Sequence, residues 1–376
     1  NIWIGFSGGL QRLTNRKGLR NFYPGTIDSY IYSVFQDKQQ RMWITSDNGV
    51  FYFKEEQLVN FTPQTGSGNT KFTGTLLPNH NILLANNEGL YEVSSQNLRV
   101  VKHAPFSQIA HTFENIFVSS KGEIFLLTGI NGVIYYFSSF HAQPIQIKNR
   151  YTSNIFQLIE ADGGIIGGNS TGFVFFNGQD FDLLQETDCN IWSLHKEDGN
   201  IWVGTDCGIG LVQNNRFEQM ELFGFGHEVV VKSILPAKNR NYLWVGTNKG
   251  FGYFNINSRE FEFTINTKDG LSGDEITPGG LFLDQNGLLW VGTYHGISNF
   301  NIRVKSSHTY APVCYIEKMY LNGEAVQLEN MQVFSHKENS FVFEISAISF
   351  ADETSVEYEY YLRGSGHNFS SYHRGS

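Results

Sequence analysis

One five-residue motif returns along this chain about every 40 residues and limits the folds open to it. The motif reads apolar–Trp–apolar–Gly–Thr and is followed by two or three polar residues and then by Gly–apolar; we call it the Trp motif. Its clearest copies are residues 201–205, 243–247 and 289–293. A repeat of this length is typical of stacked or circular repeat architectures.

Five of the six tryptophans occupy the same place in this motif, and degenerate copies carry Leu83, Phe125 or Ile165 there. Each repeat predicts four short strands, with the Trp motif as the second strand and Gly–apolar opening the third. Asp-Gly and Asn-Gly pairs in the connections accept the positive φ that tight hairpins require. Four antiparallel strands in a unit of this length predict a β-propeller blade.

The copies also predict how the ring closes. Those centred on Trp43 through Trp290 predict an all-β, seven-bladed β-propeller of four-stranded antiparallel blades over residues 15–302. The last blade then lacks an outer strand, which we expect residues 19–23 to supply, and residues 1–14 are interpreted as a hairpin left over from a preceding blade. An eight-bladed ring is the alternative, in which the hairpin around Trp3 borders the blade around Trp290.

Packing between blades explains the residue types in the motif. The large aromatic side chain is expected to fill the wedge between neighbouring sheets. The glycine is expected to let two backbones approach closely, because it has no Cβ. The motif tryptophans are therefore interpreted as structural.

The repeat stops after Phe300, and a second region begins. Residues 303–312 are a polar connector. Alternating strand patterns at 313–321, 340–345 and 356–362 predict sheets with one exposed face, and residues 313–376 are interpreted as a partial Ig-like β-sandwich. The region is shorter than the roughly 100 residues usual for such a sandwich.

Composition excludes several classes of function. The net charge is −9 without a Lys/Arg cluster, which argues against nucleic-acid binding in this region. No apolar stretch reaches the length of a membrane span. Cys189, Cys207 and Cys314 fit no zinc or disulfide framework, so we expect three unpaired thiols, with a Cys189–Cys207 bridge within one blade as the alternative. No metal site and no cofactor are predicted.

The motifs resemble a known family. Leu-Trp-Val-Gly-Thr followed by Gly-apolar-x-x-Phe is similar to the two-component regulator propeller repeat. The segments at 339–344 and 358–364 resemble the triple-tyrosine domain that follows such propellers. Three of the eight motif copies lack Trp, and Phe369 stands where that domain usually has Trp.

This resemblance implies a periplasmic sensor region of a hybrid two-component histidine kinase of Bacteroidetes. It implies recognition of glycan-derived oligosaccharides and a homodimer formed through the C-terminal sandwich. The membrane anchor and the kinase would lie outside this chain, which starts at Asn1 within a Trp motif and is interpreted as a fragment.

The predicted ligand face is where the turns after the Trp motifs meet the loops between blades, because every blade contributes a loop to one small area there. Flat aromatic rings, amides and carboxylates suit the binding of sugars. The candidate ligand-binding residues are Tyr30, Asp47, Glu88, Asp206, His227, Asn248, Lys249, Glu275, Tyr294 and His295.

Two other classes of function remain open. A polysaccharide lyase or hydrolase could use His295, His227 and Glu275 as an acid/base set, provided that they lie within hydrogen-bond reach. No nucleophile, zincin or phosphate-binding motif is present, so no catalytic residue is predicted. A protein-interaction propeller is the remaining alternative.

Overall fold

A computed structural model describes most of the chain. The described residues are 2–6, 9–13, 18–24, 29–54, 57–64, 68, 70–103, 112–129, 132–148, 153–161, 163–214, 216–220, 229–302, 313–326, 335, 337, 340–347, 357–358 and 373–374. The chain divides into two compact units, Arg16–Val304 and Asn1–Asn15 with Lys305–Ser376. In the described part, the helical structure is a single 3₁₀ turn, η1 (Thr267–Asp269), and no helix is long and apolar enough to span a bilayer.

The larger unit consists of antiparallel sheets, seven of which have four strands among the residues described. The first four sheets are β4 (Ile31–Gln36), β5 (Met42–Ser46), β6 (Gly49–Lys54) and β7 (Gln57–Asn60); β8 (Thr73–Leu76), β9 (Ile82–Asn86), β10 (Gly89–Val93) and β11 (Val100–His103); β12 (Phe113–Val118), β13 (Ile124–Thr128), β14 (Val133–Phe137) and β15 (Ile145–Lys148); and β16 (Gln157–Ala161), β17 (Gly164–Gly168), β18 (Gly172–Phe176) and β19 (Phe181–Glu186). The other three are β20 (Ile191–Glu197), β21 (Asn200–Thr205), β22 (Gly208–Gln213) and β23 (Arg216–Met220); β24 (Val231–Pro236), β25 (Tyr242–Thr247), β26 (Gly250–Asn255) and β27 (Glu260–Ile265); and β28 (Ile276–Leu283), β29 (Leu288–Thr293), β30 (Gly296–Asn301) and β3 (Leu19–Phe22).

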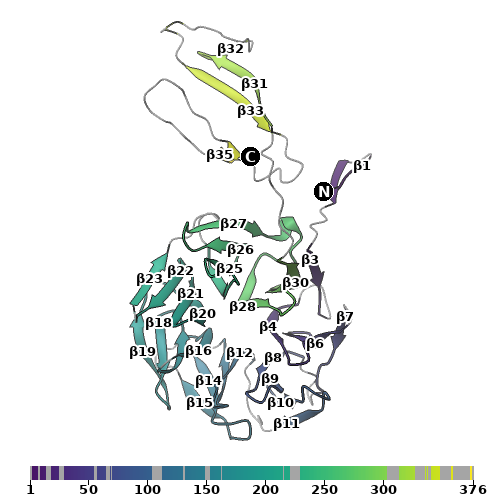
Figure 1. The fold of residues 1–376 in the computed structure, drawn as a ribbon, viewed down its shortest axis with the longest axis vertical. Helices are drawn as coiled ribbons and strands as arrows, with labels where there is room; N and C mark the ends of the chain where they lie inside the picture. The colour runs from purple at the N-terminus through teal and green to yellow at the C-terminus, as the bar shows by residue number, and fades with distance from the viewer. Residues whose placement is uncertain are drawn as a thin grey trace. The chain divides into compact units, whose positions relative to one another are not determined.

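The sheets are arranged radially, as in a β-propeller (Figure 1). The first strand of each sheet is the innermost and contacts the first strand of the next sheet, from β4 through β8, β12, β16, β20 and β24 to β28. Strand β28 in turn contacts β4, so the sheet around Trp290 borders the sheet around Trp43. This neighbour relation differs from the one expected for the eight-bladed alternative.

The N-terminal part of this unit completes the last sheet, as the sequence predicted. Strand β3 pairs antiparallel with β30, with Leu19 opposite Phe300 and Phe22 opposite Ile297. A further backbone hydrogen bond runs from the Asn301 N–H to the Gly18 carbonyl (2.8 Å). Two segments almost 280 residues apart in the sequence are therefore joined in one sheet.

The motif side chains fill the space between sheets, which confirms their structural interpretation. Four of the tryptophans, in β5, β21, β25 and β29, are at most 7% exposed, and Leu83, Phe125 and Ile165 are buried in the degenerate copies. Trp290 packs with Ile31 and Ile44 of the first sheet, so one apolar cluster joins the last sheet to the first. The side chain of Trp3 in β1 lies outside the described residues.

The motif glycines mark close approaches between sheets. A Cβ on Gly292 would lie 2.9 Å from the Ile31 Cγ2 atom, and one on Gly246 would lie 2.8 Å from the Ile276 Cγ2 atom. In both cases the neighbour is the first residue of the next innermost strand. The close approach that the sequence predicted for this glycine is therefore present.

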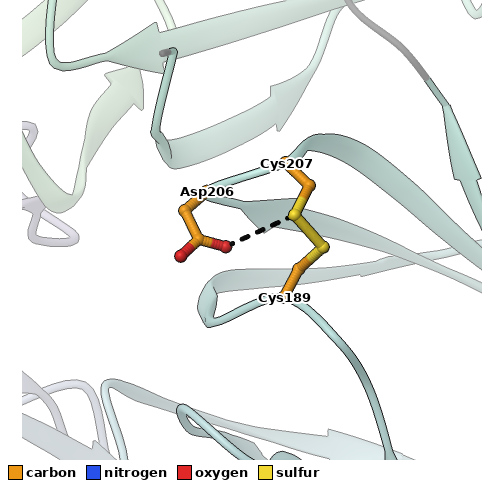
Figure 2. Close-up of side chains that lie close together, drawn as sticks. All are labelled: Cys189, Asp206 and Cys207. Atoms are coloured by element: carbon orange, nitrogen blue, oxygen red, sulfur yellow. Dashed lines mark hydrogen bonds between the residues drawn. A yellow bond between two sulfur atoms is a disulfide. The ribbon is translucent and has the colours of Figure 1, made fainter.

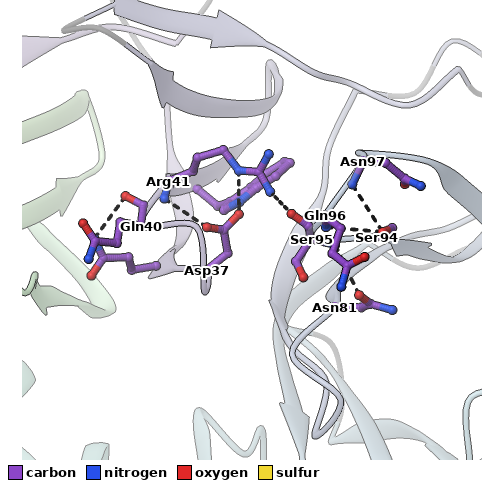
Figure 3. Close-up of polar contacts among 10 residues, drawn as sticks. Asp37, Gln40, Arg41, Asn81, Ser94, Ser95, Gln96 and Asn97 are labelled. Carbon is purple, nitrogen blue, oxygen red and sulfur yellow. Dashed lines mark hydrogen bonds and ion pairs between the residues drawn. The ribbon is translucent and has the colours of Figure 1, made fainter.

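Two of the motif tryptophans each donate an indole hydrogen bond that was not predicted from the sequence. The Trp43 Nε1–H donates to Asp37 Oδ2 (2.8 Å), and the Trp290 Nε1–H donates to Asp284 Oδ2 (3.0 Å). Each aspartate lies in the hairpin turn before the motif and also accepts backbone N–H groups of that turn. Figure 3 shows Asp37 bound by Arg41, whose guanidinium also donates to the Ser95 carbonyl of the next sheet.

Replacing Asp284 with Ala should lower the free energy of unfolding by about 2 kcal/mol, because a buried indole N–H and two turn N–H groups lose their acceptor. Asp284 is 5% exposed. The control is Asp198→Asn in the equivalent turn of the fifth sheet, where the aspartate is 56% exposed and pairs with Arg240; asparagine tolerates the positive φ of this residue. Urea unfolding followed by tryptophan fluorescence measures both variants, and equal losses would refute the structural role of Asp284.

Among the residues described, the smaller unit holds three short sheets. Strands β1 (Ile2–Phe6) and β2 (Gly9–Leu13) form a hairpin. Strand β31 (Cys314–Leu321) pairs with β32 (Glu324–Val326) and β33 (Phe341–Ala347), and β34 (Glu357–Tyr358) pairs with β35 (His373–Arg374). The predicted connector at 303–312 lies outside the described residues.

Candidate functional site

The turns after the Trp motifs lie beside the loops that precede the innermost strands. Backbone N–H groups of these turns donate to carbonyls of those loops, with Asp47 bound to Tyr30, Asp206 to Asn190, Asn248 to Val230 and Tyr294 to Glu275 (3.1–3.3 Å). Where the second strand ends in threonine, its hydroxyl fixes the turn, as where the Thr293 Oγ1–H donates to the Gly296 carbonyl (3.0 Å). The two kinds of loop that the sequence placed on one face are therefore held together, sheet by sheet.

A β-bulge in several innermost strands inserts one extra residue at the same place. The bulged residues are Tyr32 in β4, Glu114 in β12, Trp192 in β20 and Lys232 in β24. In each of these strands, the bulged residue directly follows the residue that pairs with the last residue of the sheet's second strand. Bulges re-aim side chains and are common beside functional sites.

These bulges bring polar and aromatic side chains together around the innermost strands. Strand β12 contacts β4, and β20 contacts β28, although another innermost strand lies between the members of each pair. Contacts of this kind place the inner side chains near the ring axis. We call the following set the axial cluster: Tyr30, Tyr32, Asp47, Glu114, Trp192, Lys232, Glu275 and Tyr294.

Lys232 is the cation of the axial cluster. It is 5% exposed, and its ammonium group forms an ion pair with Glu275 and donates to the Tyr294 hydroxyl (3.2 Å). Its Nζ atom also lies 4.8 Å from the Tyr294 ring centroid and 5.1 Å from that of Trp192. A buried ammonium is stable only when its charge is compensated, and here a carboxylate and two aromatic rings do so.

Aromatic rings continue on both sides of Lys232. Phe156 stacks on Trp192 with a centroid separation of 4.2 Å. Tyr30 contacts Tyr294 edge to face at 4.6 Å and Tyr32 at 4.7 Å. The Trp192 Nε1–H is buried and has no hydrogen-bond acceptor among the described residues.

Burial and acidic neighbours raise the pKa values of the tyrosine hydroxyls in the axial cluster. Burial, followed by Asp47 and Glu114, raises the pKa of Tyr32 to about 12. Burial, followed by Tyr294 and Glu114, raises the pKa of Tyr30. Glu114 is exposed, yet partial loss of hydration around its carboxyl raises the pKa of that group. Both phenols are therefore neutral and able to donate hydrogen bonds at physiological pH.

Four of the predicted ligand-binding residues belong to the axial cluster, namely Tyr30, Asp47, Glu275 and Tyr294. The other described candidates contact residues of their own sheet or its loops. Asp206 accepts from the Asn190 N–H (2.8 Å), Asn248 accepts from the Val230 N–H (3.0 Å), and Glu88 pairs with Lys102 of β11 (3.5 Å). The Lys249 and His295 backbones donate to the motif threonines of their sheets. His227 lies outside the described residues.

Tyr32, Glu114, Trp192 and Lys232 were not among the residues predicted from the sequence. A signal for three of them was present, because Ile31-Tyr32-Ser33, Ile191-Trp192-Ser193 and Val231-Lys232-Ser233 share one pattern. Trp192 is also the one tryptophan outside the Trp motif. The serines have a structural task, since Ser33 Oγ and Ser233 Oγ accept backbone N–H groups from the next innermost strands.

The expectation of three unpaired thiols is wrong. Cys189 and Cys207 form a disulfide between the loop before β20 and the β21–β22 turn (Figure 2). Cys314 is exposed and free. The turn after the Trp motif lies beside the loop that precedes the innermost strand, so the two cysteines meet although 18 residues separate them. Asp206 Oδ1 lies 3.7 Å from Cys207 Sγ. The thiolate is the form of cysteine that binds metals, and both sulfurs are bonded to each other, so Cys189, Asp206 and Cys207 do not form a metal site.

Replacing Cys189 with Ser should lower the free energy of unfolding by about 2 to 3 kcal/mol, because the unfolded chain regains the freedom of an 18-residue loop. The control is Cys314→Ser, which removes an exposed thiol and should leave stability unchanged. Thermal unfolding with and without a reductant provides the measurement. A reductant effect of equal size in the wild type and in Cys189→Ser would contradict the assignment.

An open polar depression of about 330 Å³ lies near the disulfide. Its lining residues are Ser170, Thr171, Glu186, Thr187 and Asp188. These side chains are small or acidic and include no aromatic ring, so the depression lacks the stacking surface that the axial cluster provides. The axial cluster is therefore the better candidate site.

Comparison with known families agrees with the repeat and with the radial sheets. Residues 25–48 and 270–295 match the family model described as "Two component regulator propeller". Two segments of the chain, in its first and last sheets, thus resemble this repeat family. The matched segments include Tyr30, Asp47, Glu275 and Tyr294 of the axial cluster. No curated protein matches the sequence.

Solved structures resemble this chain in fold. The extracellular domain of a protein described as the hybrid two component system BT3049 from B. thetaiotaomicron is 16% identical with a TM-score of 0.67, over 92% of this chain and 51% of that domain. That of BT4673 from the same organism is 18% identical with a TM-score of 0.60, over 80% of this chain and 40% of that domain. This chain thus spans about half or less of their length.

An enzyme shares the fold as well. Virginiamycin B lyase from Staphylococcus aureus is 11% identical with a TM-score of 0.59, over 76% of this chain and 99% of the lyase. Sensor regions and a lyase therefore use the same architecture, and the side chains of the axial cluster must decide between these functions.

Proposed function

We propose that this chain is part of the extracytoplasmic sensor region of a two-component regulator and binds a glycan-derived oligosaccharide at the axial cluster. The observation that carries the proposal is the gathering of Tyr30, Trp192 and Tyr294 beside the Lys232–Glu275 pair. Aromatic faces stack on the apolar faces of sugar rings, and carboxylates, an ammonium and an indole N–H suit their hydroxyl groups.

The location rests on two observations. A disulfide between Cys189 and Cys207 suits an oxidising compartment, and the structural relatives described as hybrid two component systems are extracellular domains. We place the chain in the periplasm, as a segment of a membrane-anchored protein whose anchor lies elsewhere.

We further propose that ligand binding biases the arrangement of a homodimer formed through the C-terminal unit, since a ligand shifts an equilibrium by its difference in affinity for two states.

The proposed domain plan follows from the strand order. We take the seven four-stranded sheets as the blades of one ring over residues 15–302; the contact between β28 and β4 supports this ring. We take β1 and β2 as a hairpin of a preceding blade. Residues 313–376 would be part of an Ig-like β-sandwich of the triple-tyrosine type, joined through residues 303–312.

We take the site as non-catalytic. Glu275, the carboxylate of the predicted acid/base set, is paired with Lys232, so it is poorly suited to abstract a proton. His295 is on the exposed turn after β29, and its backbone N–H binds the motif threonine.

Calorimetry against defined neutral, acidic and amine-bearing oligosaccharides tests this function. We expect one class to bind, and Trp192→Ala to weaken that binding roughly tenfold, because one stacked ring contributes about 0.5–1.5 kcal/mol. Trp202→Phe, in the structural motif, is the control and should leave the affinity unchanged. Absence of binding by every class would overturn the proposal. Turnover of a bound glycan would replace it with the enzyme alternative.

A further inference from the structure

The axial cluster has two halves of similar chemistry and different charge. The lysine half contains Lys232, with Trp192, Tyr294 and Glu275 around its ammonium. The tyrosine half contains Tyr30, Tyr32, Asp47 and Glu114, again aromatic rings with carboxylates. Both halves meet at the contact between the Tyr30 and Tyr294 rings. The tyrosine half differs in having no cation of its own.

Among the described residues, the carboxylates of the tyrosine half have no cationic partner. Across the described part of the chain, no Lys, Arg or His forms an ion pair with Asp47 or Glu114. The Asp47 Oδ1 atom is buried and accepts no hydrogen bond from a described residue. Glu114 reaches this half from the bulge in β12, with its carboxylate against the Cα atom of Gly129, where a Cβ would collide with it at 1.9 Å. A buried acceptor without a donor is costly and indicates a missing partner.

Electrostatic effects agree with this geometry. Besides burial, the groups that raise the pKa of Tyr32 are Asp47 and Glu114, and no neighbouring cation lowers it. The pKa of Glu114 is raised by lost hydration without a compensating positive charge. In the other half, the ammonium of Lys232 balances Glu275. The tyrosine half therefore carries uncompensated negative charge next to two aromatic rings.

We propose that the tyrosine half of the axial cluster binds the primary ammonium group of an amino sugar. This inference rests on the proposed saccharide-sensing function and specifies its ligand class. An ammonium there would pair with Glu114 and Asp47 and lie against the Tyr30 and Tyr32 rings, as Lys232 does against its own neighbours. Acidic sugars would meet two carboxylates and be rejected by charge repulsion.

Two tetramers with the same β-1,4-linked backbone test the ligand class. One is built of glucosamine, kept at a pH where its amines are protonated, and the other of N-acetylglucosamine, which is neutral. By calorimetry we expect the charged tetramer to bind at least about tenfold more tightly, a difference of about 1.4 kcal/mol. Its advantage should shrink as the salt concentration rises, because the tyrosine half is partly open to solvent.

Glu114→Gln identifies the residue responsible. Glu114 accepts no hydrogen bond from a described residue, so this variant should keep the wild-type melting temperature. It should weaken the glucosamine tetramer roughly tenfold and leave the neutral tetramer unchanged. Asp198→Asn removes the same charge from an exposed turn and is the matched control. Equal weakening of both tetramers by Glu114→Gln would overturn the inference.

The remaining outcomes separate this inference from the proposed function. If a neutral or acidic oligosaccharide binds most tightly and Trp192→Ala weakens its binding, the sensor function stands and the amino-sugar inference is wrong. If no oligosaccharide binds, both are wrong. A tetralysine peptide that binds as tightly as the glucosamine tetramer would overturn the sugar part, because an amine alone would then suffice.

Discussion

Removing residues 1–24 should destabilise the propeller by on the order of 5 kcal/mol, the largest effect we expect. The deletion takes away β3, the outer strand of the last sheet, and exposes the edge of β30. It also removes Phe22, whose ring lies 4.6 Å from Phe53 of the first sheet and 6.2 Å from Trp290 of the last. Strand β3 therefore contributes both to its own sheet and to the packing that joins the two ends of the ring.

A shorter deletion provides the control. Removing residues 1–15 takes away the β1–β2 hairpin, which belongs to the other compact unit, and leaves β3 in place. Its effect on urea unfolding of the propeller should stay within about 0.5 kcal/mol. If both deletions cost the same, β3 does not close the ring as the strand pairing indicates. Phe22→Ala in the full chain should reproduce part of the larger loss.

Replacing Lys232 with Met should lower the free energy of unfolding by about 3 kcal/mol and abolish saccharide binding at the axial cluster. Methionine keeps the bulk of the side chain, so the change tests the charge. Glu275 loses its cation, and the Tyr294 hydroxyl loses a donor. Because the Glu275 side chain is 42% exposed and can be partly rehydrated, the loss should lie at the low end for a broken buried pair.

The double variant Lys232→Met/Glu275→Gln separates charge from packing. Removing the orphaned carboxylate should restore most of the stability, since replacing both partners of a buried pair is often nearly neutral. It should not restore ligand binding. Arg240→Met is the control for breaking an ion pair: it breaks the exposed Arg240–Asp198 pair and should lower the free energy of unfolding by less than about 0.5 kcal/mol. If the double variant is no more stable than Lys232→Met, packing and not charge explains the loss.

Much of the scaffold could be predicted because it repeats. The Trp motif, its glycine and its threonine do the same local work in successive sheets, so one interpretation served many positions. The pairing of β3 with β30 was also predictable, because the last repeat lacked an outer strand and residues 19–23 had the right pattern. The hydrogen bonds from Trp43 to Asp37 and from Trp290 to Asp284 were missed, since six residues and a turn separate each pair.

The candidate site was predicted less completely. Tyr30, Asp47, Glu275 and Tyr294 were found because they stand in the turns and loops of the ligand face. Lys232 and Trp192 were missed because they lie inside strands, where an alternating pattern directs attention to the core. A bulge in β20 and in β24 turns them out of the ladder, and a bulge depends on how a strand pairs with its neighbour. The Cys189–Cys207 bridge was weighed and wrongly set aside, because the spacing of the cysteines alone carries no sign of their approach.

The amino-acid order alone determined the repeating unit, the strands within it and the residue that fills each wedge, since these depend on neighbours within about 40 residues. Tertiary structure decided which side chains meet at the axis. Lys232, Glu275 and Tyr294 come from two sheets, and Tyr30 and Glu114 from two others, so only the closing of the ring brings these charges and rings within reach of one another.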